Sequence, residues 1–336
     1  MEITIAILLQ FTTNNGYRCA DNHEVFWAKT KKSVIDREEK DREAEDLIKA
    51  IDIHAHVYTA DRATERRKSF EDAKKYFKST LVGNTIDETA EYYREREMMV
   101  VIFDVDAESQ TGLRISNDEV AAAVQKHPDV FIGFASVDPW KGKAAIKEVE
   151  RCVKDLGLKG VKFMQATMAF YPNDTRFYPL WEKIAELGVP ALFHMGTTGI
   201  GAGSPGGRGI KLKYCRPIPY IDDVAADFPE LKMICAHPAW PWHSEMLAVA
   251  RHKANVYMDL SGWAPKYFPP EVVHYANSLL QDKVLFGSDY PLISPDRWLN
   301  EFAELNLKEE VRPKILLHNA AKLLGIDLGS QEEQAG

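Results

Sequence analysis

Apolar residues recur along most of the chain in short, nearly continuous runs that are separated by longer amphipathic segments. Runs of this kind, in which apolar residues do not strictly alternate with polar ones, are typical of strands buried on both faces. Eight runs can be recognised, at residues 50–56, 98–106, 130–138, 159–165, 189–196, 231–238, 255–262 and 283–291. We therefore expect a buried strand at each of these eight places.

The segments between the runs have the pattern of helices. Examples are NDEVAAAVQKH, KAAIKEVERCVKDLG and YPLWEKIAELG, and the last two end in glycine, as helices often do. Strands that alternate with helices form a parallel sheet, and eight such units are the number that closes a barrel. The sequence therefore predicts an α/β fold, a (β/α)8 TIM barrel at 49–326, followed by a C-terminal tail at 327–336.

Residues 1–48 have a different character. The apolar opening MEITIAILLQF contains Glu2, has no basic start, and is too short to span a bilayer. A stretch dense in alternating charge follows, KKSVIDREEKDREAEDLIK, which is typical of an exposed helix. We expect a partly helical N-terminal extension that lies outside the barrel.

Composition narrows the classes of partner. The chain has 336 residues, of which 45% are hydrophobic, so it can bury one large core. The formal net charge is −8 and no basic block is longer than RRK at 66–68, which argues against nucleic acid and anionic membranes as partners. Its four cysteines form no CxxC pair, which favours a reducing compartment, and we expect a cytoplasmic protein.

Residues that can bind a metal ion or move a proton lie at or near the ends of five predicted strands. They are His54 and His56 on the first strand, Lys162 on the fourth, His194 on the fifth, His237 on the sixth and Asp289 on the eighth. In a barrel of this type the carboxyl ends of the strands form the active face. Two histidines that are two residues apart on a strand point to the same side. Imidazole and carboxylate are ligands of Zn²⁺ and related ions, so the pattern predicts a metal site there.

Each of these residues also has a structural interpretation. His194 and His237 could be packed histidines at strand ends, and Asp289 could cap the following turn. Lys162 could form an ion pair with a carboxylate or bind an anionic substrate, because a buried lysine needs a partner. The occurrence of such residues at five strand ends favours chemistry over packing.

The motifs DIHAH, GVKF, VPALFHMG, CAHP and VLFGSDYP occur in the order found in the amidohydrolase superfamily. Over about residues 50–326 the chain resembles the amidohydrolase-related branch that contains aminocarboxymuconate semialdehyde decarboxylase. The resemblance implies one divalent ion, Zn²⁺ with Mn²⁺ as the alternative, held by His54, His56, His194 and Asp289. It implies His237, with Asp289, as the acid–base residue, a carboxylated Lys162 if a second ion is present, and a homodimer.

A closer similarity lies in PALFHMGTTGIGAGSPGGRGIKLKY and VYMDLSGWAPKYFPP, which resemble 4-hydroxyphenyl-β-ketoacyl-CoA hydrolases. Met164 and Thr198 stand where that subgroup has histidines, which changes the lining of the pocket. We therefore expect a metal-dependent hydrolase that activates water for attack on a carbonyl carbon, with C–C hydrolysis of an aromatic β-ketoacyl substrate as the specific form. The alternatives are a non-oxidative decarboxylase of an aromatic or muconate-type acid and a catalytically silent barrel that acts as a binding module.

The predicted substrate is a small carboxylate or thioester. Decarboxylases of the branch that the chain resembles hold a carboxylate with an arginine from the loop after the first strand, and the resemblance therefore implies Arg62 as a candidate substrate-binding residue. The aromatic residues Trp240, Trp263 and Tyr290 follow strand ends and could wall an aromatic pocket. Arg62 could equally lie on a solvated face, and the aromatic residues could pack in the core or at its rim.

Overall fold

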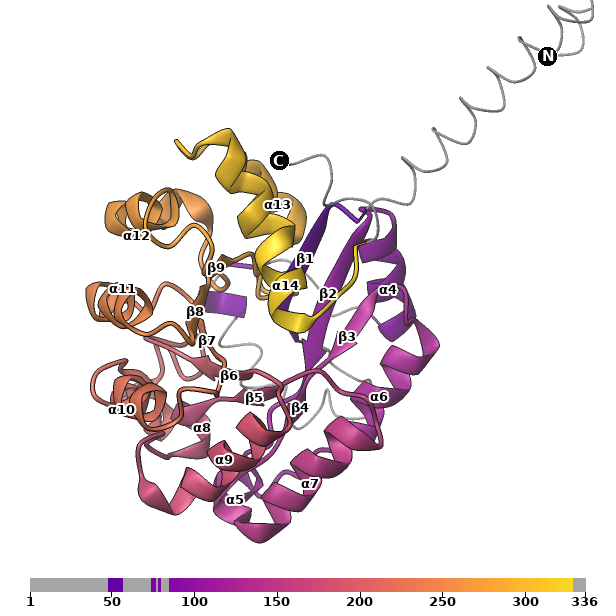
Figure 1. Cartoon of the computed structure of the whole chain (residues 1–336), viewed down its shortest axis with the longest axis vertical. Coiled ribbons are helices and arrows are strands. Elements are labelled where there is room, and N and C mark those ends of the chain that lie inside the picture. Colours follow the sequence, from indigo (N-terminus) through magenta and orange to yellow (C-terminus); the bar gives the residue numbers. More distant parts are fainter. Residues whose placement is uncertain (1–47, 57–73, 77, 80–84, 329–336) are drawn as a thin grey trace, which may run out of the picture. The chain divides into compact units, whose positions relative to one another are not determined.

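A computed structural model of the chain describes residues 48–56, 74–76, 78–79 and 85–328 (Figure 1). Of the predicted N-terminal extension, only residue 48 is among the described residues. Of the predicted C-terminal tail, only residues 327 and 328 are described. The described residues form a ring of parallel strands with helices around it (Figure 1).

The strands fall within the eight predicted runs. In chain order they are β1 (Ala50–His56), β2 (Met98–Phe103), β3 (Phe131–Gly133), β4 (Ala135–Ser136), β5 (Val161–Phe163), β6 (Ala191–His194), β7 (Met233–Ala236), β8 (Val256–Asp259) and β9 (Val284–Leu285). Neighbours pair in parallel as β1-β2-β3 and as β4-β5-β6-β7-β8-β9. The third run is therefore divided into two strands, β3 and β4.

The division occurs at Phe134 and does not open the barrel. The amide of Phe134 donates to the carbonyl oxygen of Ile102 on one side at 3.0 Å. The next amide, of Ala135, donates to the carbonyl oxygen of Gly160 on the other side at 2.8 Å. The third strand thus changes partners at one residue and bonds to both neighbours.

Backbone hydrogen bonds also join the last strand to the first. The amide of Ile53 donates to the carbonyl oxygen of Phe286 at 3.0 Å, and that of His56 donates to Tyr290 at 2.8 Å. A parallel bridge pairs Ala55 with Tyr290. The ring is thereby closed, and the predicted (β/α)8 barrel is confirmed.

Helices alternate with the strands. They are α4 (Ile86–Arg94), α5 (Glu108–Thr111), α6 (Asn117–Lys126), α7 (Lys143–Lys154), α8 (Gln165–Met168), α9 (Tyr178–Glu186), α10 (Tyr220–Asp227), α11 (His243–His252), α12 (Pro270–Ala276), α13 (Pro295–Ala303) and α14 (Asn319–Leu324). Shorter helical turns are η2 (Pro139–Lys141), η3 (Thr175–Phe177), η4 (Pro205–Gly209), η5 (Leu212–Cys215), η6 (Pro265–Tyr267), η7 (Glu309–Val311) and the π-type η8 (Lys314–His318). The side chain of Ser116 caps α6 by accepting from Asp118, and Thr85 and Glu88 form a capping box at α4.

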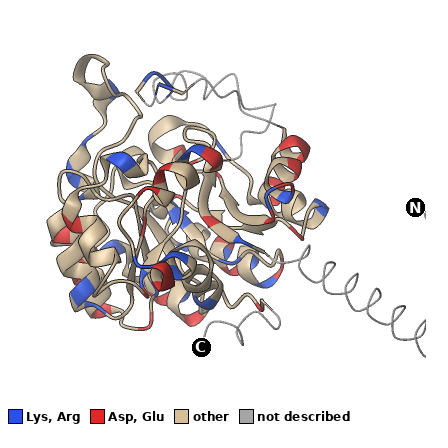
Figure 2. Ribbon diagram, turned by 90° about the horizontal axis from the view of Figure 1, so that it is seen from above, with Lys and Arg blue, Asp and Glu red and all other residues tan. Residues whose placement is uncertain are grey.

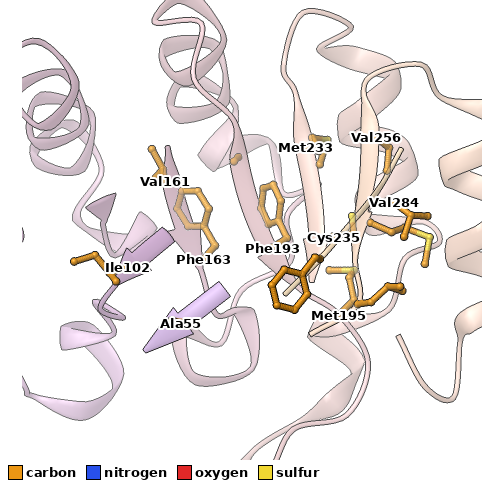
Figure 3. Close-up of a cluster of buried hydrophobic side chains, with 14 of the residues drawn as sticks. Ala55, Ile102, Val161, Phe163, Phe193, Met195, Met233, Cys235, Val256 and Val284 are labelled. Carbon is orange, nitrogen blue, oxygen red and sulfur yellow. The ribbon is translucent and has the colours of Figure 1, made fainter. Parts of the chain in front are cut away.

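Two apolar layers lie on the two faces of the strands. The outer layer, between strands and helices, includes Ala55, Ile102, Val161, Phe163, Phe193, Met233, Cys235, Val256 and Val284 (Figure 3). The inner layer includes Ile51, Ile53, Val101, Ile132, Leu192, Ile234 and Leu285, together with Leu317, Ala320 and Leu323 from η8 and α14. Asn319 donates to the carbonyl oxygens of Gln281 and Val284, at the amino end of β9. η8 and α14 therefore cover the end where the strands begin.

An irregularity in β1 directs its histidines. Asp52 is paired with Val100 and Ala55 with Ile102. Between these two pairs β1 advances by three residues and β2 by only two, so β1 contains one extra residue. Ile53 belongs to the inner layer, and the ring of His54 lies 4.9 Å from that of Phe103, which also belongs to it. Strict alternation would place neighbours such as Ile53 and His54 on opposite faces. The extra residue lets both face the interior.

Charged residues of both signs are interspersed along the described part of the chain (Figure 2). Many are paired, such as Arg151 with Asp118 and Glu148, each at 2.9 Å. No helix within the described residues is both long and apolar enough to cross a bilayer.

Candidate metal centre

Three of the four predicted ligands lie together at the carboxyl ends of the strands. The Oδ1 atom of Asp289 is 3.6 Å from Nε2 of His54 and 3.2 Å from Nε2 of His56. One ligand atom from each residue lies within 4.8 Å of the others. Two ligands of a tetrahedral ion at about 2.0 Å are separated by roughly 3.3 Å. The donors are therefore spaced, and chemically suited, for one divalent ion.

The fourth predicted ligand, His194, lies beside this group next to His237. The Nδ1 atom of His194 is 3.0 Å from Nε2 of His237, and its Nε2 atom donates to the carbonyl oxygen of Thr197 at 3.0 Å. The rings of His237 and His54 are 5.0 Å apart. The structure thus brings all five predicted acid–base and metal residues into one cluster, with His237 next to His194.

Gln165 holds the end of β6 through its side-chain amide. Its Nε2 atom donates to the carbonyl oxygen of His194, and its Oε1 atom accepts from the His194 amide, both at 3.0 Å. These two hydrogen bonds replace the backbone hydrogen bonds that β5, which ends at Phe163, no longer supplies to β6. The sequence pattern did not single out Gln165.

His237 and Asp289 share an unusual backbone conformation. Their φ angles are +74° and +69°, in the left-handed region that few residues other than glycine adopt. The amide of Asp289 donates to the carbonyl oxygen of His54 at 2.9 Å, which holds that turn against β1. Residues in such conformations concentrate at functional sites, where the surrounding structure maintains them.

Burial and neighbouring charges set the protonation states of the cluster. Burial lowers the pKa of His54 and of His194 well below the usual value, and the charge of Lys162 adds to this effect. Burial alone would raise the pKa of Asp289, but the hydrogen bond from His56 and the nearby histidines hold it well below its usual range. Neutral imidazoles and an ionised carboxylate are the forms that bind metal ions.

Lys162 is fully buried beside the first histidine. Its Nζ atom is 3.5 Å from Nε2 of His54 and 5.0 Å from the centre of the Phe103 ring. Burial lowers the pKa of Lys162 to about 8, against the opposing charges of Asp259 and Asp289. No carboxylate of a described residue lies within ion-pairing distance, so the ion pair considered for Lys162 is not found. Metal bridging and substrate binding stay predictions.

Two residues at the carboxyl end of β8, its last residue Asp259 and the following Ser261, contact the histidines, and neither was predicted from the sequence. Oδ2 of Asp259 is 3.0 Å from Nδ1 of His54. The carbonyl and hydroxyl oxygens of Ser261 both lie 2.9 Å from Nδ1 of His237. The available signal was an acid closing the apolar run VYMD, in the same position as the histidines of other strands.

Asp52 is a second acid whose role was not predicted from the sequence, and it supports the site by linking β1 to the segment before Asp289. It accepts hydrogen bonds from the hydroxyl of Tyr93 at 2.8 Å, from the amide of Ser288 at 2.9 Å and from the Ser288 hydroxyl. The amide of His54 donates to the same carboxyl group at 3.1 Å. Asp52 therefore connects β1 to the segment that leads into Asp289. Burial raises its pKa to about 7, against the effect of these hydrogen bonds.

The predicted substrate residues have different locations. Trp240 is 46% exposed, its ring is 6.3 Å from that of Trp263, and its carbonyl oxygen accepts from the amide of Thr197 near His194. Tyr290 is buried and its ring stacks on Tyr92 of α4 at 5.4 Å, so it packs outside the barrel. Arg62 lies outside the described residues.

The family model described as Amidohydrolase matches residues 51–326. The chain belongs to the amidohydrolase family. This amidohydrolase is 24% identical over 258 residues to 2-amino-3-carboxymuconate-6-semialdehyde decarboxylase of Dictyostelium discoideum, with 68% of this chain and 71% of the relative covered. It is 23% identical to the gamma-resorcylate decarboxylase of Polaromonas sp. (strain JS666 / ATCC BAA-500), covering 64% and 76%. The predicted superfamily and branch are confirmed.

Solved structures show the same fold. A TIM-barrel protein, Bb4693 from Bordetella bronchiseptica, superimposes with a TM-score of 0.68 at 24% identity, covering 82% of the amidohydrolase and 98% of that chain. A dihydroxybenzoic acid decarboxylase from Polaromonas sp. JS666, with bound manganese and 2-nitroresorcinol, gives 0.58 at 19% identity, covering 82% and 97%. At these identities the similarity shows the barrel fold alone.

Proposed function

We propose that the protein is a metal-dependent, non-oxidative decarboxylase of a small aromatic or muconate-type carboxylic acid. The observation that carries the proposal is the meeting of His54, His56 and Asp289 within 4.8 Å at the barrel mouth, with His237 beside them. The decarboxylases among the relatives support decarboxylation over the hydrolysis that the sequence alone favoured.

The proposed ligands of one divalent ion are His54, His56, His194 and Asp289. When bound, the ion supplies positive charge that stabilises the substrate's carboxylate or a neighbouring oxygen as electrons move. Nitrogen and oxygen donors suit both Zn²⁺ and Mn²⁺. The manganese in the related dihydroxybenzoic acid decarboxylase structure supports Mn²⁺ as a candidate alongside the Zn²⁺ expected from the sequence.

In this proposal His237 supplies the proton. As the bond between the substrate carbon and its carboxylate breaks, the electron pair stays on the carbon, CO₂ leaves, and Nε2 of His237 gives its proton to that carbon. Burial lowers the pKa of His237, whereas the carboxylates of Asp289 and Asp259 favour its charged form. Ser261 holds the other ring nitrogen and thereby orients the ring.

Product analysis tests the proposal. Purified protein supplied with Mn²⁺ or Zn²⁺ is incubated with 2,6-dihydroxybenzoate, 5-carboxyvanillate, a muconate-type acid and a β-ketoacyl thioester. Release of CO₂ from one of the acids, lost on chelation and in His237→Ala, supports decarboxylation. Absence of CO₂, together with oxygen from labelled water in a new carboxylate, would establish the hydrolase alternative. Stoichiometric metal without turnover of any compound would favour the binding module.

A further inference from the structure

The segment 259–262 begins at the last residue of β8 and contacts both His54 and His237. Asp259 is fully buried, and its Oδ2 atom lies 3.0 Å from Nδ1 of His54. Ser261 presents two oxygens to Nδ1 of His237 at 2.9 Å. Gly262 has a φ of +70°, and a Cβ atom there would lie 2.5 Å from Nδ1 of His237. The backbone of this segment is therefore packed directly against the His237 ring.

The neighbours of His54 determine which of its ring nitrogens carries the proton. Carboxylate oxygens accept hydrogen bonds, and Oδ1 of Asp259 already accepts from the Ser261 amide, so the 3.0 Å contact of Oδ2 assigns the donated proton to Nδ1 of His54. On the other side, Nζ of Lys162 lies 3.5 Å from Nε2, and a lysine ammonium only donates. Both neighbours thus favour the same tautomer, in which Nε2 carries no proton.

The unprotonated nitrogen faces the proposed ion site. Nε2 of His54 and Oδ1 of Asp289 are 3.6 Å apart, which is too long for a hydrogen bond and suits two ligands of one ion. His54, His237 and Asp259 also have ligand atoms within 4.8 Å of one another. Because the proton on Nδ1 of His54 is held by Asp259, that second group does not form a metal site of its own.

We propose that Asp259 is a positioning residue that fixes His54 in the Nδ1-protonated tautomer and so presents Nε2 to the divalent ion. This inference rests on the proposed function. A carboxylate that accepts from a liganding histidine also orients the ring and raises its basicity, and loss of such a partner typically lowers metal affinity about 10- to 100-fold.

The second oxygen of Asp259 makes the substitution by asparagine informative. Oδ1 accepts from the backbone amide of Ser261 at 2.7 Å and from that of His237 at 3.4 Å. In Asp259→Asn the amide oxygen must stay at these two donors, which leaves the NH₂ group facing His54. That NH₂ group can only donate, so Nδ1 must become the acceptor, which favours the tautomer protonated on Nε2, the nitrogen needed by the ion.

The test measures Mn²⁺ affinity of the folded apo-protein by competition with a chelating dye. Asp259→Asn is expected to bind Mn²⁺ about 10- to 100-fold more weakly than the wild type, with unchanged circular dichroism. The matched control is Asp138→Asn. Asp138 is equally buried and accepts from the amides of Ser109 and Trp140 without touching a histidine, so its variant should keep wild-type affinity.

The second readout is the ¹⁵N NMR spectrum of the histidine rings in the wild-type apo-protein, which needs neither metal nor turnover. An unprotonated Nε2 on His54 is the expected result, and it decides the question if Asp259→Asn does not fold. A proton on Nε2 in the wild type, or unchanged Mn²⁺ affinity in folded Asp259→Asn, would overturn the inference. Absence of Mn²⁺ binding by the wild type would instead defeat the proposed function, while the spectrum still tests the tautomer.

Discussion

At the scale of single residues, the histidines of the cluster could be predicted from the sequence, whereas the buried acid Asp259 that contacts them could not. His54, His56, His194 and His237 stand out because imidazoles are rare at the ends of apolar strands. Asp259 does not, because its partner His54 is 205 positions away and an acid at a strand end often only caps a turn. Which acids touch the histidines is decided by tertiary structure alone.

Substitution of two histidines should separate binding of the ion from proton transfer. His54→Ala removes a proposed ligand and is expected to lose both bound metal and turnover, whereas His237→Ala is expected to lose turnover and keep its metal. Metal analysis and CO₂ release measured on the same preparations check this. Normal turnover in His237→Ala would show that the acid–base assignment is wrong.

Asp52 should make stability depend on pH. Burial raises its pKa to about 7 in the folded protein, from 3.8. Between these values the folded protein binds more protons than the unfolded chain, so the contribution of Asp52 to the free energy of unfolding falls as pH rises from about 4 to 7.

Urea unfolding of the wild type and of Asp52→Asn at pH 5 and pH 7.5 measures this effect. The asparagine variant should lose less stability than the wild type between the two values, by an amount on the order of a few kcal/mol. An identical pH dependence in both proteins would contradict the assignment.

At the scale of elements, the eight strand positions could be predicted because strands buried on both faces are apolar throughout. Their local irregularities could not. The extra residue in β1 turns both Ile53 and His54 inward, and the division at Phe134 changes strand partners. Both irregularities depend on how neighbouring strands pair, and the same apolar sequence would also be compatible with a regular strand.

The short segment between β9 and Asp289 should tolerate little added volume. A Cβ atom at Gly287 would lie 2.9 Å from Cβ of Ser261, 3.2 Å from Oδ1 of Asp259 and 3.2 Å from Cβ of His54. Gly287→Ala is therefore expected to cost about 1–3 kcal/mol of stability and to weaken metal binding. Thermal unfolding and dye competition measure the two effects, and wild-type values for both would show that this packing is not needed.

At the scale of the whole molecule, the barrel places every proposed ligand at one end, while η8 and α14 cover the other. This arrangement follows from the strand order, so the location of the site could be predicted once eight strands were recognised. The homodimer implied by the family resemblance stays a prediction. Light scattering should give twice the 38.1 kDa mass of one chain, and a mass of one chain would contradict it.

We propose that residues from separate strands hold one divalent ion, and quantitative metal analysis is the sharpest test of this site. Purified wild-type protein, reconstituted with Mn²⁺ or Zn²⁺ and desalted, should retain about one ion per chain. The double variant His54→Ala/His56→Ala, treated identically, should retain far less. Equal metal content in the two proteins, or none in the folded wild type, would show that these histidines do not form a metal site.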